Sequence, residues 1–210
     1  GLVACDVHGK NHHSEGTFGR HLCGLRMRVA DGRVLEISEA SEPELFRATQ
    51  GGMGLTGQIL EVEVALRRIP SPWLRVETRA FPDIDALVSG LREASRYSPY
   101  TLAWSDTTAR GRALGRGILI TGDWAEPSAA PTRAPVFRAP FELPFDLPSA
   151  LIAPWSIRLF NSAYFRLYGR ARSGIAHPRA FFHPLDVIGR WNRAYGRRGF
   201  VQYQCVVPVS

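Results

Sequence analysis

The chain has 210 residues, enough for one or two domains with a sizeable hydrophobic core. Hydrophobic residues make up 45% and charged residues 21% of it, which is ordinary for a globular protein and argues against a disordered chain. The formal charge of +7 comes from scattered arginines and a single lysine. No run of Lys or Arg is long enough for a nucleic-acid patch, so we expect no nucleic-acid partner, whereas an anionic lipid surface or a phosphate-bearing substrate stays open.

Three cysteines, Cys5, Cys23 and Cys205, are too few and too scattered for a disulfide framework or a zinc site. We interpret them as free thiols, as in a reducing compartment. No apolar run approaches the roughly 20 residues of a membrane span. Because the chain starts and stops next to segments that resemble strands, we expect it to be an internal fragment of a longer protein.

The first third of the chain predicts a small mixed domain. The apolar residues of 2–7 are typical of a short strand, and the polar, glycine-containing stretch 10–19 predicts a loop. Alternating apolar and polar residues around Ala30-Asp31-Gly32 predict a β-hairpin of residues 24–29 and 33–37.

A short helix follows over residues 41–49, with Ser41 as the N-cap and Glu44 three residues later in a capping-box pattern. Gly51-Gly52-Met53-Gly54 ends this helix, and residues 55–69 predict a long strand.

Pro70-Ser71-Pro72 is the best internal boundary. Beyond it we expect strands at 73–81, 100–104, 113–122 and 199–207, helices at 83–96 and 154–169, and an extended apolar segment at 181–186. The Pro-rich residues 125–154 predict a long surface excursion. In the helix of 154–169, the apolar side chains that share one stripe are Ile157, Phe160, Tyr164 and Leu167.

The polar stretch near the start invites two conventional interpretations. His8, His12 and His13 could suggest a metal site, but a third ligand at a suitable spacing is missing, so we predict none. Ser14, His8 and Asp6 could suggest a hydrolase, but the Gly-x-Ser-x-Gly elbow occurs nowhere.

Glycines beside short polar residues favour a third interpretation. Gly51-Gly52-Met53-Gly54 is not the dinucleotide fingerprint, and it follows a helix rather than a strand. It is either a helix stop or a place where the backbone approaches a ligand. Backbone amides and carbonyls of this kind can lie close to a flat, hydrogen-bonding ring such as a flavin, whose redox chemistry the cofactor itself supplies.

Five stretches carry a resemblance to a known family. Ala4-Cys5-Asp6-Val7-His8-Gly9-Lys10, continuing to Gly19, resembles the flavin-binding segment of FAD-linked oxidases of the vanillyl-alcohol oxidase superfamily. Gly51-Gly52-Met53-Gly54-Leu55-Thr56-Gly57-Gln58-Ile59 resembles the next flavin-side motif. The other stretches resemble a branch that oxidises a polyprenyl-phosphate sugar; they are Phe182-His183-Pro184-Leu185-Asp186, Trp191-Asn192-Arg193-Ala194-Tyr195-Gly196 and Gly199-Phe200-Val201-Gln202-Tyr203-Gln204.

The resemblance implies an α+β fold. Residues 1–71 would be the second lobe of a two-lobed FAD-binding domain, and residues 72–210 part of a substrate domain with an antiparallel sheet. The family's pyrophosphate-gripping lobe and its closing segment would lie outside this sequence, so we expect the fragment alone to be inactive and to lack bound FAD.

The same resemblance assigns residues to roles. Cofactor contacts would come from Cys5, Asp6, Val7, His8, Gly9 and Ile59, and the catalytic residues would be Lys10 and His8. Substrate contacts would come from Gly9, Lys10, Trp104, Phe182, Leu185, Arg193, Gln202 and Gln204. Leu102 stands where the family has a small polar residue and Phe182 where it has a tyrosine, so this pocket would be less polar.

The implied function is FAD-dependent oxidation of a secondary sugar hydroxyl, the 2-hydroxyl of a polyprenyl-phosphate pentose, in cell-wall arabinose formation. A partner NAD(P)H-dependent reductase would reduce the keto sugar. The protein would be bacterial and cytoplasmic or associated with a membrane surface, with the periplasm left open. Two alternatives remain: a non-catalytic binding or interaction module on a truncated flavoenzyme scaffold, and an FAD oxidase of another alcohol such as an alditol.

Overall fold

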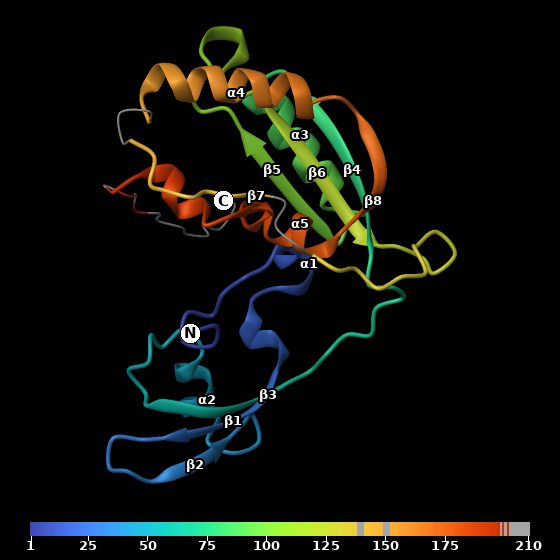
Figure 1. The fold of residues 1–210 in the computed structure, drawn as a ribbon. Helices are drawn as coiled ribbons and strands as arrows, with labels where there is room; N and C mark the ends of the chain where they lie inside the picture. Colours follow the sequence, from blue (N-terminus) through green and yellow to red (C-terminus); the bar gives the residue numbers. More distant parts are fainter. Residues whose placement is uncertain (138–140, 149–151, 198, 200, 202–210) are drawn as a thin grey trace. The chain divides into compact units, whose positions relative to one another are not determined.

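The computed structural model describes residues 1–137, 141–148, 152–197, 199 and 201 (Figure 1). The chain divides into two compact units. The first is Gly1–Ile69 with Ala94–Thr101, and the second is Pro70–Glu93 with Leu102–Ser210. Helices and mainly antiparallel sheets occur together, so the predicted α+β class is confirmed. The assignment of flavin and substrate domains to residues 1–71 and 72–210 stays a prediction.

A three-stranded antiparallel sheet, in the order β2-β1-β3, forms the first unit. Its strands are β1 (Leu22–Arg28), β2 (Val34–Ile37) and β3 (Gln58–Val64). The predicted hairpin is confirmed, because Leu25 pairs with Ile37 and Arg28 with Val34. Helix α2 (Pro43–Thr49) packs Phe46 into a core whose other buried members are Val3, Leu25, Met27 and Ile37.

Four predictions for this unit are wrong in whole or in part. Residues 2–7 form consecutive turns instead of a strand, because the left-handed backbone of Asp6 (φ 41°) interrupts extended structure. The loop of 10–19 contains two helical turns, α1 (His12–Glu15) and η1 (Phe18–His21). Ser41 does not cap α2; the residue before its first turn is Glu42, which is left-handed (φ 56°) and makes no side-chain cap. The strand predicted over 55–69 is shortened to β3, whose later start follows the positive-φ residues Gly54 and Gly57.

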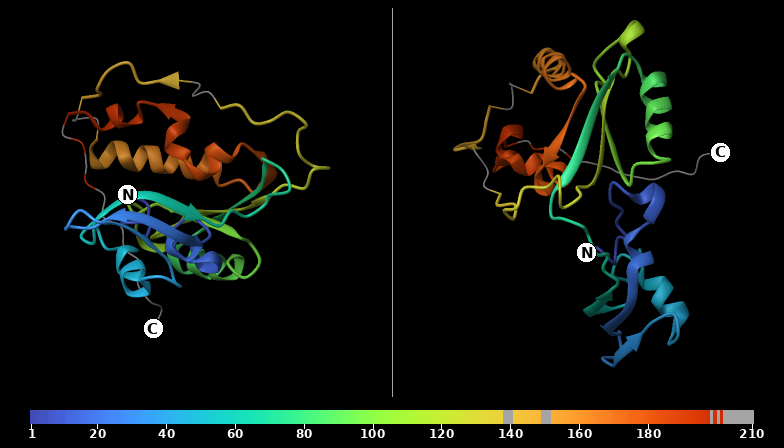
Figure 2. Two further views of the ribbon diagram at one scale, coloured as in Figure 1. Left: turned by 90° about the horizontal axis from the view of Figure 1, so that it is seen from below. Right: turned by 90° about the vertical axis from the view of Figure 1, so that its right-hand side faces the viewer.

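In the second unit, a four-stranded antiparallel sheet has the order β5-β6-β4-β8. Its strands are β4 (Leu74–Phe81), β5 (Tyr100–Ser105), β6 (Gly117–Trp124) and β8 (Arg172–Ala176). Helix α3 (Ile84–Ala94) lies on one face, and α4 (Pro154–Tyr168) and α5 (Pro178–Phe182) lie on the other (Figure 2).

Glycines allow the helices to pack closely on this sheet. A Cβ atom at Gly122 of β6 would collide with the Phe181 ring of α5, at 2.7 Å from its nearest carbon. A Cβ atom at Gly90 of α3 would overlap the ring of Phe81 at the end of β4. Both helical layers therefore rest directly on the strands, and the α4–α5 layer carries the cavity described below.

Sequence periodicity gave a mixed outcome in this unit. The strand of 73–81 and the helices of 83–96 and 154–169 are confirmed, with ends shifted slightly. The segment 181–186 is helical instead of extended, in α5 and η4 (Pro184–Val187), and strand β8 was not predicted. Strand β6 starts at Gly117 and not at 113, since η2 (Gly111–Ala113) precedes it. The strand predicted at 199–207 lies outside the described residues except for 199 and 201.

The described residues of the predicted excursion over 125–154 are mostly irregular, as predicted, and the remaining elements are short. They are β7 (Phe141–Glu142), which pairs in parallel with β9 (Ile188–Gly189), and η5 (Trp191–Tyr195). No helix in the described ranges has both the length and the apolar character needed to cross a bilayer.

Candidate functional site

The predicted flavin-side segment takes its shape from backbone hydrogen bonds. Within it, the Val7 amide donates to the Leu2 carbonyl at 3.2 Å, and the Phe18 amide donates to the Val7 carbonyl at 2.8 Å. The Gly51 and Met53 amides donate to the carbonyls of Val3 and Ala4 at 3.0 and 2.8 Å. The two glycine-containing motifs of the first unit, far apart in sequence, therefore lie side by side.

Asp6 holds the fold of this segment. Its Oδ1 accepts the Gly19 amide proton at 2.7 Å, which closes the loop between them. Any Cβ at position 19 would lie 2.9 Å from that same oxygen and would also overlap the Gln50 side chain, so only glycine fits. The carboxylate is thus engaged inside the protein, and a contact to a cofactor would fall to the neighbouring backbone.

Lys10 is half-buried at the far end of the segment. Its carbonyl accepts the Thr101 amide proton at 3.0 Å, which fixes the backbone that carries the side chain. Burial lowers the pKa of the Lys10 ammonium from its usual value. An amine in such surroundings gains more from an anionic or hydroxyl-bearing ligand than a fully solvated one does.

The histidines of this segment make contacts within the first unit. The rings of His8 and His12 lie 4.9 Å apart, and His13 Nε2 is 3.0 Å from the Ser98 carbonyl. Ser14 donates its hydroxyl proton to the Asn11 carbonyl at 3.0 Å. Within the described residues, no three His, Cys, Asp or Glu side chains are gathered as metal ligands.

The other predicted cofactor residues differ in exposure. Cys5 and Gly9 are exposed at the surface of the unit, where a ligand can reach them. Ile59 is partly buried and packs against the hydrophobic core around Met27. If Ile59 contacts a cofactor, it must therefore do so through the part of its side chain that is not packed against the core.

The second unit contains a cavity of about 530 Å³ between its sheet and the α4–α5 layer. Alternate residues of β4, Val76 and Thr78, contribute to its floor, since every second side chain of a strand faces the same side. Most of the lining is apolar or aromatic, from residues that include Leu102, Trp104, Ile120, Tyr164, Ile175 and Phe181. Arg172 is the charged side chain in this wall.

Trp104 and Tyr164 form an aromatic wall of the cavity. Their ring centroids are 4.8 Å apart with the planes tilted by 51°. Burial raises the pKa of the Tyr164 hydroxyl, and the nearby Tyr168 raises it further while Arg172 lowers it. The hydroxyl therefore stays protonated at neutral pH and can donate a hydrogen bond.

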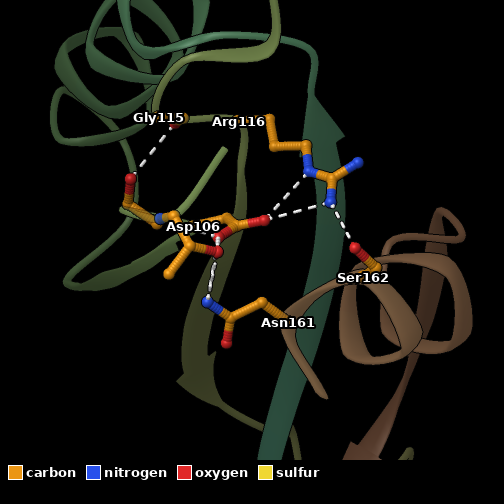
Figure 3. A network of polar contacts seen from close by, with 7 residues as sticks. Asp106, Gly115, Arg116, Asn161 and Ser162 are labelled. Carbon is orange, nitrogen blue, oxygen red and sulfur yellow. Dashed lines mark hydrogen bonds and ion pairs between the residues drawn. The ribbon is translucent and has the colours of Figure 1, made fainter. Parts of the chain in front are cut away.

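A buried polar network holds α4 against the strands (Figure 3). Asp106 is 1% exposed; its Oδ1 accepts from Thr108 at 2.6 Å and from Asn161 of α4 at 2.9 Å. Its Oδ2 accepts from Arg116 Nη2 at 3.0 Å, and the same nitrogen donates to Ser162 at 3.1 Å. Because Asn161 and Ser162 lie just before Tyr164, the network positions Tyr164 against Trp104.

Asp106 is a carboxylate throughout the physiological range. Burial raises its pKa, but the hydrogen bonds from Thr108, Asn161 and Arg116 outweigh burial and lower the pKa to about 2. A permanently charged group with this many partners anchors structure and does not exchange protons at neutral pH.

The predicted substrate residues are not gathered at one place. Trp104 lines the cavity, whereas Phe182 lines a separate shallow hollow with His183 and Asp186. Leu185 is exposed, and Arg193 donates to the carbonyls of Leu143, at 3.1 Å, and Pro144. Gln202 and Gln204 lie outside the described residues. The roles of these residues as substrate contacts stay predictions.

Sequence reasoning missed three residues of this region. The sequence placed Tyr164 on one apolar stripe with Ile157, Phe160 and Leu167; those three are exposed, whereas Tyr164 lines the cavity. Arg172 and Asp106 carried no motif at all. An acidic residue followed two positions later by threonine, as in Asp106-Thr107-Thr108, is the one local signal for an Asx-type turn.

Comparisons with known proteins give no matching family model. The whole chain, however, aligns with the decaprenylphosphoryl-β-D-ribose oxidase of Mycolicibacterium smegmatis, with 34% identity over 218 aligned positions. The chain is a relative of that oxidase. The family resemblance stated from the sequence motifs is thereby confirmed.

A second relative is an uncharacterized Streptomyces coelicolor protein, 38% identical over 129 residues, which are 61% of this chain and 35% of the relative. The chain spans 47% of the length of the Mycolicibacterium oxidase, so it corresponds to about half of that relative.

Proposed function

We propose that this chain is part of an FAD-dependent oxidoreductase that oxidises a secondary hydroxyl of a sugar. The observation that carries the proposal is the similarity of the entire chain to a decaprenylphosphoryl-β-D-ribose oxidase. The substrate would be a polyprenyl-phosphate pentose oxidised at its 2-hydroxyl, and the keto product would pass to an NAD(P)H-dependent reductase in cell-wall arabinose formation. When bound, FAD would supply the two-electron oxidation.

The first unit has features that fit a flavin. Cys5 and Gly9 are exposed on a segment whose shape is fixed by internal hydrogen bonds, so a flat ring could approach its backbone without competing with the fold. Gly54 adds a second open position, because a Cβ atom there would meet nothing within 4 Å. Residues 4–9 and 51–54 would therefore hold the ring and exclude water from its edge.

Lys10 would bind and orient the substrate. Its half-buried ammonium would donate to a substrate hydroxyl or phosphate oxygen, and the lowered pKa reflects the burial that such a contact would offset. His8 would assist at the reacting hydroxyl as a proton acceptor, since imidazole is the side chain suited to that task near neutral pH.

The cavity of the second unit would hold part of the substrate. Trp104 and Tyr164 offer aromatic faces against which a sugar or a prenyl unit can pack. Arg172 would contact the phosphate. Leu102, in place of the family's small polar residue, makes the wall less polar and favours the lipid part of the substrate here.

The test is the visible spectrum of the full-length protein together with turnover of a polyprenyl-phosphate pentose. Lys10→Met should leave the flavin absorption band intact and cut turnover at least about 100-fold, whereas Lys10→Arg should recover part of it. Gly9→Val should do the reverse and weaken flavin binding, because a branched side chain would be forced against the ring.

A flavin band missing even after FAD is added would overturn the proposal in favour of a non-catalytic binding module. A flavin band together with turnover of an alditol, and none of the lipid-linked pentose, would keep the oxidase class and replace the substrate.

A further inference from the structure

The residues that follow Lys10 are tied at two points to a segment far away in the sequence. His13 Nε2 lies 3.0 Å from the Ser98 carbonyl oxygen, and the Lys10 carbonyl accepts the Thr101 amide proton at 3.0 Å. Both partners belong to the first unit, which includes Ala94–Thr101. Lys10 precedes His13 by three positions, and Ser98 precedes Thr101 by three. We call these two equally spaced hydrogen bonds the His13 clamp.

His13 is the side-chain half of this clamp. A carbonyl oxygen only accepts, so Nε2 of His13 carries the proton and donates it to Ser98. The other ring nitrogen, Nδ1, is buried and has no hydrogen-bond partner among the described residues. The bond to Ser98 therefore sets both the tautomer and the orientation of the ring.

The acceptor of the His13 proton is itself held firmly. The Ser98 amide donates to the Ala94 carbonyl at 2.8 Å, and Ala94 at the end of α3 is 1% exposed. Thr101 is the second residue of strand β5. The clamp therefore joins the Lys10 segment to backbone that secondary structure already fixes.

The Lys10 segment needs such a connection. Helix α1 has four residues, and a helix of that length is not stable by itself in water. Gly9 precedes Lys10 and adds backbone freedom. One hydrogen bond, at the Lys10 carbonyl, would hold this backbone at a point and let it pivot. A second bond three residues later also fixes its direction, and with it the direction of the half-buried Lys10 side chain.

We propose that His13 is a positioning residue that acts through Lys10. Its bond to Ser98 holds Lys10 in the orientation in which the ammonium meets a hydroxyl or phosphate oxygen of the substrate. The catalytic consequence rests on the function proposed above for Lys10, whereas the orientation itself can be measured without turnover. His13 contacts neither flavin nor substrate in this role.

The first experiment is His13→Ala in the full-length protein with FAD and a polyprenyl-phosphate pentose. We expect the flavin band of the wild type and a kcat per bound flavin about 10–100-fold lower, because a misplacement of about 1 Å can cost that much. KM should rise by less than about threefold, since a misplaced ammonium still attracts the substrate but no longer aligns it. A merely structural His13 would lower the amount of flavin-loaded protein and leave kcat per flavin unchanged.

Two amide variants test the geometry of the bond. The amide nitrogen of Gln corresponds to Nε2 of histidine, and that of Asn corresponds to Nδ1. His13→Gln should therefore reach the Ser98 carbonyl and recover kcat to within about threefold of the wild type, whereas His13→Asn should be as slow as His13→Ala.

The matched control is Arg67→Gln. It breaks the exposed ion pair of Arg67 with Glu15, 2.9 Å long, which ties the same helical turn without contacting the clamp. An exposed ion pair of this kind contributes little, so turnover should equal that of the wild type.

A double variant tests whether His13 acts through Lys10. Lys10→Met with His13→Ala should be as slow as Lys10→Met alone, because a side chain that is absent cannot be misplaced. Two readouts need no turnover. In His13→Ala, the Thr101 amide should exchange its hydrogen at least about tenfold faster, and an amine-directed acylating reagent should modify Lys10 at least about threefold faster, as read by peptide mass spectrometry.

Four results would overturn the proposal: an unchanged kcat per flavin in His13→Ala, Gln no better than Asn at position 13, an equal loss in Arg67→Gln, and additive losses in the double variant. A wild-type protein without flavin or turnover would refute the oxidase instead. In that case, unchanged exchange at Thr101 and unchanged acylation of Lys10 would overturn the orienting role of His13, and faster rates would support it.

Discussion

The two regions proposed to contact ligands are built in different ways. In the first unit, residues 4–10 are shaped by amide-to-carbonyl hydrogen bonds and by glycines, with the Asp6 carboxylate as a side-chain clasp. In the second unit, the cavity is shaped by side chains alone: an aromatic pair, Trp104 and Tyr164, placed by the charged network of Asp106. The shape of the first region therefore depends on backbone conformation, and the shape of the second depends on contacts between side chains.

This difference tells what each region tolerates. A segment shaped by its backbone can change most side chains but few glycines, and it presents amides and carbonyls to a ligand. A cavity shaped by side chains can change its lining, and with it its ligand, as long as the polar network underneath stays complete. Substitutions should therefore affect the two units by different mechanisms, and separate probes exist because all five tryptophans lie in the second unit.

The largest effect is expected for Asp106→Ala. It removes the carboxylate that the Arg116 guanidinium and the Asn161 amide share as an acceptor, and removing one partner of a buried ion pair costs about 3–5 kcal/mol. Urea unfolding followed by tryptophan fluorescence should show the loss. Asp123→Ala, an exposed position on β6, is the control and should change stability by less than about 0.5 kcal/mol. A loss of under about 1 kcal/mol for Asp106→Ala would mean that packing alone holds α4.

In the first unit, the substitution Gly57→Ala should have the corresponding effect and lower the stability by roughly 2–3 kcal/mol. Gly57 has φ 146°, and a Cβ atom there would overlap the Arg28 carbonyl and lie 2.8 Å from Met27 Cε. Gly54→Ala is the matched control, since φ is also positive (81°) but the space around it is open. Hydrogen exchange of the β1 and β3 amides should report the loss, with the tryptophan signal unchanged. If Gly57→Ala and Gly54→Ala lowered the stability equally, the close approach of the Arg28 carbonyl to Gly57 would be unimportant.

The same contrast explains which features of the fold could be predicted from the sequence and which could not. The hairpin of β1 and β2 and helix α3 follow from local patterns, an Asp-Gly turn and a helical period, and both were predicted. The cavity was not, because its residues come from seven separate elements and meet only through tertiary packing. Among its lining residues, Trp104 and Leu102 carried a signal, and that signal came from the family resemblance.

Two errors have the same origin. Residues 2–7 are apolar enough for a strand, but the left-handed Asp6 and its bond to Gly19 turn the chain, and neither is visible as a pattern. Helix α4 was located correctly, but the period of its sequence does not tell which side faces the sheet, because apolar residues occupy both sides and a polar residue of the inward side, Asn161, binds Asp106. Short apolar runs such as 181–186 do not distinguish helix from strand.

Acid should weaken the second unit through Asp106, by about 2 kcal/mol. The folded pKa is about 2 and the unfolded value is near 4, so the unfolded chain takes up the proton first as the pH falls. The contribution is complete above about pH 4 and is lost as the pH falls toward 2. The stability difference between the wild type and Asp106→Asn, measured by tryptophan fluorescence, should shrink across this window. If that stability difference did not change with pH, the loss of stability in acid would come from another titrating group and not from Asp106.

The smallest effect, at Asp6, tests whether charge matters in the backbone-shaped unit. Asp6→Asn keeps an oxygen that can accept the Gly19 amide proton, and Asn tolerates the left-handed backbone, so we expect a loss of about 0.5 kcal/mol. Asp6→Ala removes the acceptor and adds strain, and should cost about 1.5 kcal/mol, read from far-ultraviolet circular dichroism during unfolding. If Asn were as damaging as Ala, the carboxylate charge would be essential, and the first unit would depend on electrostatics as the second does. If the predicted order holds, the fold of this segment needs an acceptor at the right place and conformation, which leaves its charge balance free for a ligand.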